Sequence, residues 1–220
     1  MATALLVTLF TGLLYWSTAL RGFDLGDTAS FQTMVGSDVI GPRDGYPLYF
    51  ALTGLVFELA GGDAARVANL TSAAAAAVTS GLIVLVGWQI AGSALAAIGA
   101  ALLFAGSYTF WSQAVIAEVY TLHMLLISVG LLLLLRWDER PTAGRLAAFL
   151  AVYALSFGNH LTSILLLPAY ALFLLTAPRE RWRQGAAKRA VAMGFGLAVA
   201  AALQYVWNLR TLWISPIPAA

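Results

Sequence analysis

Seven long apolar runs divide this sequence, and they constrain its fold more than any other feature. An α-helix needs roughly 17–25 mostly apolar residues to cross a bilayer, and inside lipid its backbone must bond to itself. The runs cover residues 4–20, 67–91, 94–110, 119–135, 146–157, 161–177 and 191–209. We therefore predict an all-α, polytopic transmembrane helix bundle of about seven spans, with the first run kept as an anchor.

The composition excludes several classes of protein. Hydrophobic residues make up 61% and charged residues 10% of the 220 positions, whereas a soluble domain carries about 25% charge. Twelve basic and ten acidic residues leave a net charge of +2 with no basic stripe, which argues against nucleic-acid binding. With no cysteine and two histidines, thiol chemistry and a Cys/His metal cage are excluded, and no metal site is predicted.

The charges also predict the orientation. Residues 46–60 are apolar but short for a span and include Glu58, so we interpret them as an interfacial or re-entrant helix. One side of the membrane then receives eight of the twelve bases and the other seven of the ten acids. By the positive-inside rule the N-terminus is cytoplasmic, and residues 21–66 form a long extracytoplasmic loop. Lys188 is the one lysine among the bases, a bias that suggests a GC-rich bacterium and its inner (cytoplasmic) membrane.

Two carboxylates, Asp24 and Asp27, follow the first run directly. A carboxylate that is partly removed from water can have its pKa raised toward the range in which it takes a proton from a hydroxyl. Asp27 could equally cap a helix that begins at this point. The two interpretations, general base and N-cap, are both open on the sequence.

A turn-rich stretch brings Arg43, Asp44 and Tyr46 to the start of the interfacial segment. The guanidinium of Arg43 matches phosphate geometry, but pairing with Asp44 explains it about as well. Tyr46 suits the headgroup level of a membrane.

Four further polar residues lie at the outer ends of apolar runs: Glu118, His123, Asn159 and His160. An ionisable residue at the edge of a span indicates a functional site, although Glu118 could instead cap a helix or pair with Arg66. His123 could be a packing histidine, and a Gly-Asn turn would account in part for Asn159 and His160. All four are expected on the same outer side as Asp27.

The order of five short motifs resembles the GT-C superfamily of membrane glycosyltransferases and, within it, the DUF2723 family of TMEM260-like protein O-mannosyltransferases. These motifs lie at residues 26–31 (GDTASF), 45–49 (GYPLY), 66–70 (RVANL), 110–120 (FWSQAVIAEVY) and 158–162 (GNHLT). The resemblance covers nearly the whole chain and implies a single GT-C-like domain over residues 1–220. Its relatives are commonly longer, so the chain is expected to be the N-terminal part of a longer protein.

The resemblance also implies a reaction. A mannose-like sugar would move from a polyprenyl (or dolichyl) phosphate donor in the membrane to a hydroxyl acceptor, a protein Ser/Thr or a glycan. Asp27 would be the general base, with Asp24 as the alternative, and Arg43 or His160 would neutralise the lipid phosphate. A divalent-metal requirement and the oligomeric state stay open.

Two positions depart from the family pattern and keep other hypotheses in view. Ser30 stands where relatives have a second acid, and Pro42 where they have a histidine. A degenerate, non-catalytic relative is therefore one alternative. A membrane transporter or lipid-handling protein, in which the outer acids bind cations or headgroups, is the other.

Overall fold

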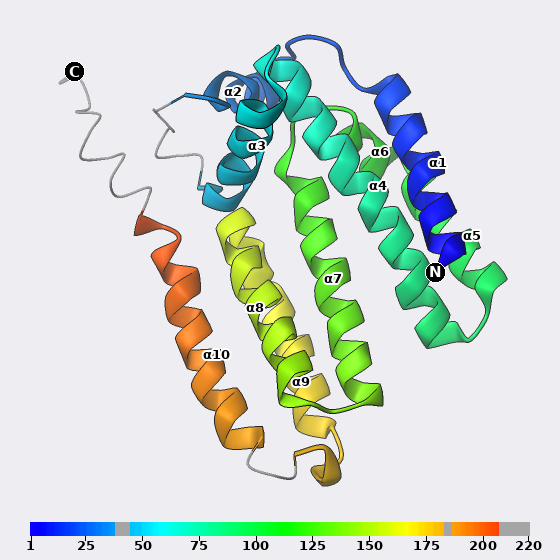
Figure 1. Ribbon diagram of the computed structural model, residues 1–220, viewed down its shortest axis with the longest axis vertical. Coiled ribbons are helices and arrows are strands. Elements are labelled where there is room, and N and C mark those ends of the chain that lie inside the picture. The colour runs from blue at the N-terminus through cyan, green and yellow to red at the C-terminus, as the bar shows by residue number, and fades with distance from the viewer. Residues whose placement is uncertain (38–44, 183–185, 207–220) are drawn as a thin grey trace.

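The computed structural model describes residues 1–37, 45–182 and 186–206, and this part of the chain contains helices and no strand (Figure 1). The elements are α1 (Ala2–Thr18), α2 (Gly26–Met34), α3 (Pro47–Ala60), α4 (Ala64–Ala91), α5 (Ala94–Gly106), α6 (Tyr108–Ala114), α7 (Val119–Glu139), α8 (Ala143–Asn159), the 3-10 helix η1 (Leu161–Leu166), α9 (Leu167–Thr176), the 3-10 helix η2 (Arg179–Trp182) and α10 (Ala186–Leu203). The predicted all-α class is confirmed.

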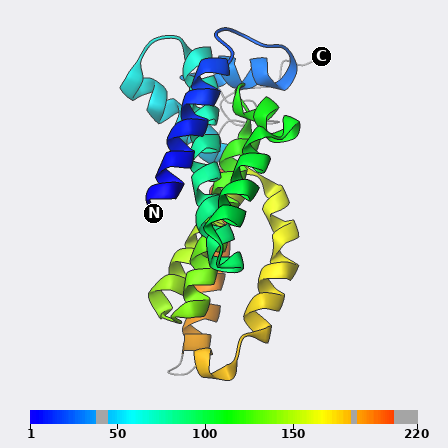
Figure 2. The same cartoon turned by 90° about the vertical axis from the view of Figure 1, so that its right-hand side faces the viewer.

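The long helices run side by side, and the short helices α2 and α3 gather at one end, the upper end in Figure 1. The connections from α1 to α2, from α6 to α7 and from α8 to η1 all lie at this upper end. The turns from α4 to α5, from α7 to α8 and from α9 toward α10 lie at the opposite, lower end (Figures 1 and 2). The segments that carry the predicted site residues therefore share one end of the bundle.

Two described helices, α4 and α7, are long and apolar enough to cross a membrane, and the pair α5 and α6 would make a third span. The other apolar helices, α1, α3 and η1 with α9, have at most 17 residues. These findings fit a membrane protein with two or three evident spans, and the seven-span layout stays a prediction.

Two of the apolar runs, each predicted to form one continuous helix, are divided into two helical segments in the structure. The run at 94–110 breaks at Ser107, where α5 and α6 meet with a bend of 65°. The carbonyl of Phe104 accepts both the backbone N–H of Ser107 at 3.2 Å and its hydroxyl at 2.7 Å, which closes the end of α5. The run at 161–177 begins as the 3-10 turn η1 before Pro168 opens α9.

Local sequence explains where α4, the longest helix, begins and ends. Asp63 is its N-cap, and the carboxylate accepts a hydrogen bond of 2.7 Å from the Arg66 amide. Gly92 ends it in the left-handed conformation at φ 64°, which glycine adopts without a steric penalty. Pro47 occupies the first turn of α3, where its missing N–H costs no hydrogen bond.

Small residues let α1, α4 and α5 approach closely. A buried cluster joins Tyr15 of α1 to Ala73, Ala76 and Ala77 of α4 and Ala105 of α5. The Tyr15 hydroxyl donates to the Ala105 carbonyl at 2.8 Å. Between membrane helices such a bond contributes about 1 kcal/mol, and close backbone packing supplies the rest.

The lower end is held by aromatic side chains and an ion pair. Trp137, Phe149 and Tyr170 are buried together, which packs α7, α8 and α9. Arg181 forms a salt bridge with Asp138 in the last turn of α7. This end also carries Arg136, Arg140 and Arg145 and so has the basic character that the sequence predicted for one side.

Candidate active site

A buried amide pair fixes the loop that follows α1. The Gln32 side chain of α2 donates to Asn69 Oδ1 of α4 at 2.8 Å, and both side chains have no exposed surface. Asn69 in turn donates to the Leu20 carbonyl at 2.9 Å, and Gln32 accepts from the Asp24 amide at 3.0 Å. Because each buried amide is bonded to loop backbone, the position of α2 against α4 is well defined.

Asp27 lies in the first turn of α2, at the upper end of the bundle. The N-cap position belongs to Leu25, so the N-cap interpretation of Asp27 is wrong. The carboxylate of Asp27 is exposed, and its place in the first turn suits a negative charge because amide N–H groups point toward it. Asp24 precedes the helix, and its Oδ1 atom accepts from the Leu25 amide at 2.8 Å.

Glu118 is a carboxyl group that the fold removes partly from water. It is half-buried between α6 and α7, and its Oε1 atom accepts a hydrogen bond of 3.2 Å from Thr28, the residue after Asp27. Burial raises the pKa of Glu118; the Thr28 hydrogen bond opposes this, and the nearby charges of Asp27 and Asp24 add to it. The sequence analysis assigned such a raised pKa to a carboxylate of the loop after the first run, Asp24 or Asp27, whereas the structure supports a raised pKa for Glu118.

The alternatives offered for Glu118 do not match its contacts. It occupies the N-cap position of α7, but its side chain makes no capping hydrogen bond. The Arg66 guanidinium donates to the carbonyls of Ala19 and Leu20, both at 3.2 Å. The backbone of Glu118 is held by the Ser72 hydroxyl, 3.0 Å from its amide nitrogen. The side-chain partner of the Glu118 carboxylate is instead Thr28 of α2.

A histidine cluster, formed by Tyr46, Tyr120, His123, His160 and Thr162, lies at the same end. The ring centroids of His123 and His160 are 5.3 Å apart, and those of His160 and Tyr120 are 5.6 Å apart. The Thr162 hydroxyl is 2.7 Å from His160 Nδ1 and 3.5 Å from His123 Nε2. Burial lowers the pKa of His160. The cluster thus presents neutral imidazole and hydroxyl groups that can donate or accept.

Asn159 fastens this cluster to α7. Gly158 and Asn159 belong to the last turn of α8, so no separate Gly-Asn turn occurs. The buried Asn159 side chain donates to the Val119 carbonyl at 3.0 Å. Its Oδ1 atom and the Nδ1 atom of His123 are buried and have no partner among the described residues. These two buried polar atoms are therefore exceptions to the rule that buried polar groups are hydrogen-bonded.

Aromatic contacts join the two halves of the site. Phe31 of α2 meets Tyr46 edge-on with ring centroids 5.6 Å apart, and Tyr46 meets His160 at 5.6 Å. These ring contacts pack α2, the helix that carries Asp27, against the histidine cluster through Tyr46. Arg43 and Asp44, the predicted phosphate-binding pair, lie outside the described residues.

Sequence reasoning missed Thr28, Gln32, Tyr120 and Thr162 as site residues. Thr28, Tyr120 and Thr162 stand inside three of the five motifs, so their positions were a usable signal. Nothing in the sequence marks Gln32, whose partner is 37 positions away. In the described part of the chain, no group of three or more acidic or histidine residues could hold a metal ion.

These features define an all-helical membrane protein with its polar site at one end of the bundle. The family described as "Protein O-mannosyl-transferase TMEM260 N-terminal domain" matches residues 39–184, more than half of the chain. The chain therefore belongs to this TMEM260-like family. The matched range includes Glu118, His123, Asn159 and His160 and begins after α2.

A curated relative supports this assignment. Protein O-mannosyl-transferase TMEM260 of Mus musculus is 28% identical over 171 residues, which cover 74% of this chain. The chain spans about a quarter of that relative's length, 24%. No solved structure matches the chain.

Proposed function

We propose that this protein is an integral membrane glycosyltransferase of the GT-C type. It moves a mannose-like sugar from a polyprenyl phosphate to a hydroxyl acceptor such as a protein Ser/Thr. In this proposal the chain crosses the membrane seven times with its N-terminus inside, and the upper end of the bundle is extracytoplasmic. The support is the family membership together with a polar site gathered at one end of an apolar bundle.

Asp27 is the general base in this proposal. Its exposed carboxylate, in the first turn of α2, can meet an acceptor hydroxyl that approaches from water. An Oδ atom of Asp27 takes the hydroxyl proton as the acceptor oxygen bonds to the anomeric carbon. The bond between that carbon and the phosphate oxygen breaks, the lipid phosphate leaves with the electron pair, and the configuration inverts.

The histidine cluster receives the phosphate group. His160 and Thr162 can donate hydrogen bonds to phosphate oxygens, and a bound dianion would favour the protonated imidazole. Arg43 would add a full positive charge, and Asp24 is the alternative base. The buried Nδ1 of His123 and Oδ1 of Asn159 would find their partners in the bound donor.

One observation carries the proposal. The hydrogen bond from Thr28 to Glu118 and the ring contacts from Phe31 through Tyr46 to His160 bring the Asp27 helix and the histidine cluster into one site. A base on one side and a phosphate-binding group on the other is the arrangement that an inverting transfer requires.

The test is Asp27→Asn in purified protein, assayed for transfer from a mannosyl polyprenyl phosphate to a Ser/Thr peptide. General-base catalysis contributes about 10²–10⁴-fold, so the rate should fall by about that factor while the protein stays folded. Asp24→Asn is the matched control and should retain most of the activity. Undiminished transfer by Asp27→Asn overturns the base role. Flux of substrate through sealed vesicles without product would favour a transporter instead.

A further inference from the structure

Side chains of α4 hold the loop between α1 and α2, residues 19–25. The Arg66 guanidinium donates to the carbonyls of Ala19 and Leu20, both at 3.2 Å. The Asn69 amide donates to the same Leu20 carbonyl at 2.9 Å. Because both donors belong to the longest helix, they fix the start of the loop relative to the bundle.

Gln32 of α2 contacts the loop from its other side. Its Nε2 atom donates to the Gly22 carbonyl at 3.2 Å and to Asn69 Oδ1 at 2.8 Å, and its Oε1 atom accepts from the Asp24 amide at 3.0 Å. All four polar atoms of the two amide side chains therefore have a partner, although neither side chain has any exposed surface. A buried polar network in which every member is satisfied is rigid. We call Gln32, Arg66 and Asn69 the loop clamp.

The clamped loop also meets the connection between α6 and α7. The Leu20 amide donates to the Val115 carbonyl at 2.8 Å, in the segment that leads to Glu118. Three of the five sequence motifs thus meet at one loop: GDTASF follows it, RVANL supplies two side-chain donors and FWSQAVIAEVY supplies a backbone acceptor. The RVANL motif has no part in the proposed chemistry, and its contacts are with this loop.

We propose that the loop clamp positions Asp27 for its chemistry, so that its three members are positioning residues. The inference rests on the proposed function for the role of Asp27 and adds which side chains hold that carboxylate in place. Gln32 lies on the same helix as Asp27, so its bond to Asn69 fixes that helix against α4. The hydrogen bonds of the clamp to the loop go to backbone atoms. The clamp therefore acts on the reaction through the loop.

Hydrogen–deuterium exchange of the peptide that covers residues 19–25 measures the clamp without requiring sugar transfer. Asn69→Leu keeps a similar side-chain size and removes the donor to the Leu20 carbonyl. We expect amide exchange in this peptide to become about tenfold faster, because buried hydrogen bonds that oppose local opening are lost. The matched control is Thr71→Val, which removes a hydroxyl bonded at 2.9 Å to a carbonyl of its own helix and should leave loop exchange unchanged.

Arg66 provides a second test, because it is only partly buried and its replacement leaves the buried amide pair intact. Arg66→Met keeps an aliphatic stem and removes the donors to Ala19 and Leu20, so exchange of the loop should again become faster. Arg66→Lys keeps a donor at the end of the stem and should restore part of the protection. Exchange at the wild-type rate in Arg66→Met would overturn the clamp, whether or not Asn69→Leu folds.

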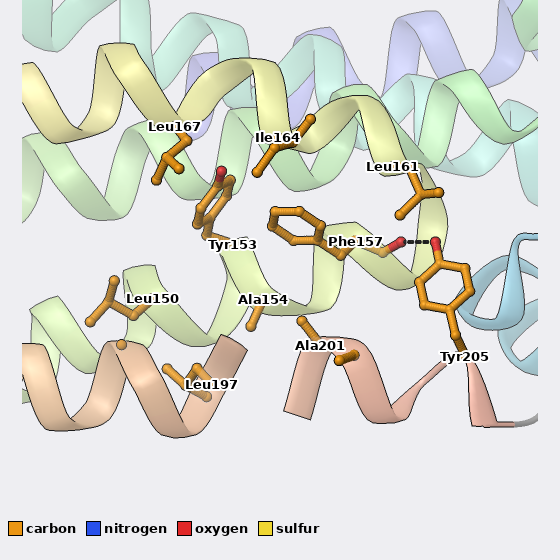
Figure 3. Close-up of a pocket in the computed structure, with 12 residues that line it drawn as sticks. Leu150, Tyr153, Ala154, Phe157, Leu161, Ile164, Leu167, Leu197, Ala201 and Tyr205 are labelled. Carbon is orange, nitrogen blue, oxygen red and sulfur yellow. Dashed lines mark hydrogen bonds between the residues drawn. The ribbon is translucent and has the colours of Figure 1, made fainter. Parts of the chain in front are cut away.

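A further control lies far from the clamp along the row of helices in Figure 1, beside an apolar cavity of about 710 Å³ between α8, η1 with α9, and α10 (Figure 3). The Tyr205 hydroxyl, at the lining of this cavity, donates to the Phe157 carbonyl at 2.5 Å. Tyr205→Phe thus removes the same kind of bond, from a side chain to the backbone of another helix. Exchange of residues 19–25 should stay at the wild-type rate. Faster exchange there would show that any loosening of the upper end has this effect, and would overturn the specific role of the clamp.

The transfer assay separates the clamp from the proposed function. A catalytic group misplaced by about 1 Å can cost about 10²-fold in rate, so we expect kcat in Arg66→Met to fall by up to about that factor. The KM for the acceptor peptide should stay near the wild-type value, since the clamp does not bind the acceptor. Faster exchange with unchanged kcat would overturn the positioning role and leave the transferase standing. Faster exchange in the variants of a protein that transfers no sugar would support the clamp and contradict the transferase.

Discussion

The hydroxyl of Thr28 donates a hydrogen bond of 3.2 Å to the carboxylate of Glu118, 90 positions further along the chain. This bond ties α2, which carries Asp27, to the beginning of α7. The Glu118 backbone forms hydrogen bonds with the Ser72 hydroxyl of α4. The Thr28–Glu118 hydrogen bond therefore also connects α2 to α4. Glu118 therefore links the helix that carries Asp27 to α4 and α7.

Replacing Thr28 with valine should show how much the hydrogen bond between Thr28 and Glu118 contributes to stability and to the transfer rate. The side chain keeps its shape and loses its donor, so we expect about 1 kcal/mol less stability and a lower transfer rate. Thr28→Ser retains the hydroxyl and should recover both. Thermal unfolding in detergent and the transfer assay measure the two effects; equal behaviour of the valine and serine variants would contradict a contribution of this hydrogen bond.

The pKa of Glu118 predicts a pH dependence of stability. Burial raises this pKa, so the folded protein holds the proton to a higher pH than the unfolded chain does, for which about 4.3 is typical. The stabilisation is present below the unfolded pKa and is lost as the pH rises through the folded one. The melting temperature of wild type should therefore fall relative to Glu118→Gln as the pH rises from about 4.

The control for this pH experiment is Glu58→Gln, which removes one exposed negative charge from α3. Wild type and Glu58→Gln should give the same pH profile within error. A Glu118→Gln profile parallel to wild type would show that the raised pKa of Glu118 does not contribute to stability.

Close packing of α1 on α4 predicts a second stability effect. A Cβ atom at Gly81 would meet the Thr8 side chain and lie 2.9 Å from the Ala4 carbonyl oxygen. Since backbone must move, Gly81→Ala should cost about 1–3 kcal/mol. Gly99→Ala, on α5 with nothing within 4 Å of the new atom, is the control and should be neutral or stabilising. Equal melting temperatures for the two variants would refute the packing argument.

The proposed orientation predicts opposite accessibility at the two ends of the bundle. The chain has no cysteine, so single cysteines can be introduced at Ser37, beyond α2, and Gly144, at the start of α8. A membrane-impermeant maleimide should label Ser37→Cys in intact cells and Gly144→Cys only after permeabilisation. If both cysteines were labelled in intact cells, the chain could not cross the membrane an odd number of times between residues 37 and 144, and the proposed orientation would be wrong.

Much of the fold was predictable because hydropathy is a local property of the sequence. The apolar runs marked the long helices within a few residues. Asp63 and Gly92, which cap α4 in the structure, were not identified from the sequence. The break at Ser107 was not predicted, because the run at 94–110 was interpreted as one continuous helix even though residues 107–110 are more polar than residues 94–106.

The sequence predicted which residues of the candidate site lie at one end of the bundle. It did not predict the contacts between them. The sequence by itself determined that Asp24, Asp27, Glu118 and His160 would share a side, because the number of helices between them sets where each lies. Only the tertiary structure decided that Thr28 bonds to Glu118, that burial acts on the Glu118 carboxyl while Asp27 stays exposed, and that α8, α9 and α10 leave an apolar cavity. Those outcomes depend on how helices distant in the sequence pack against one another, and no short stretch of sequence contains that information.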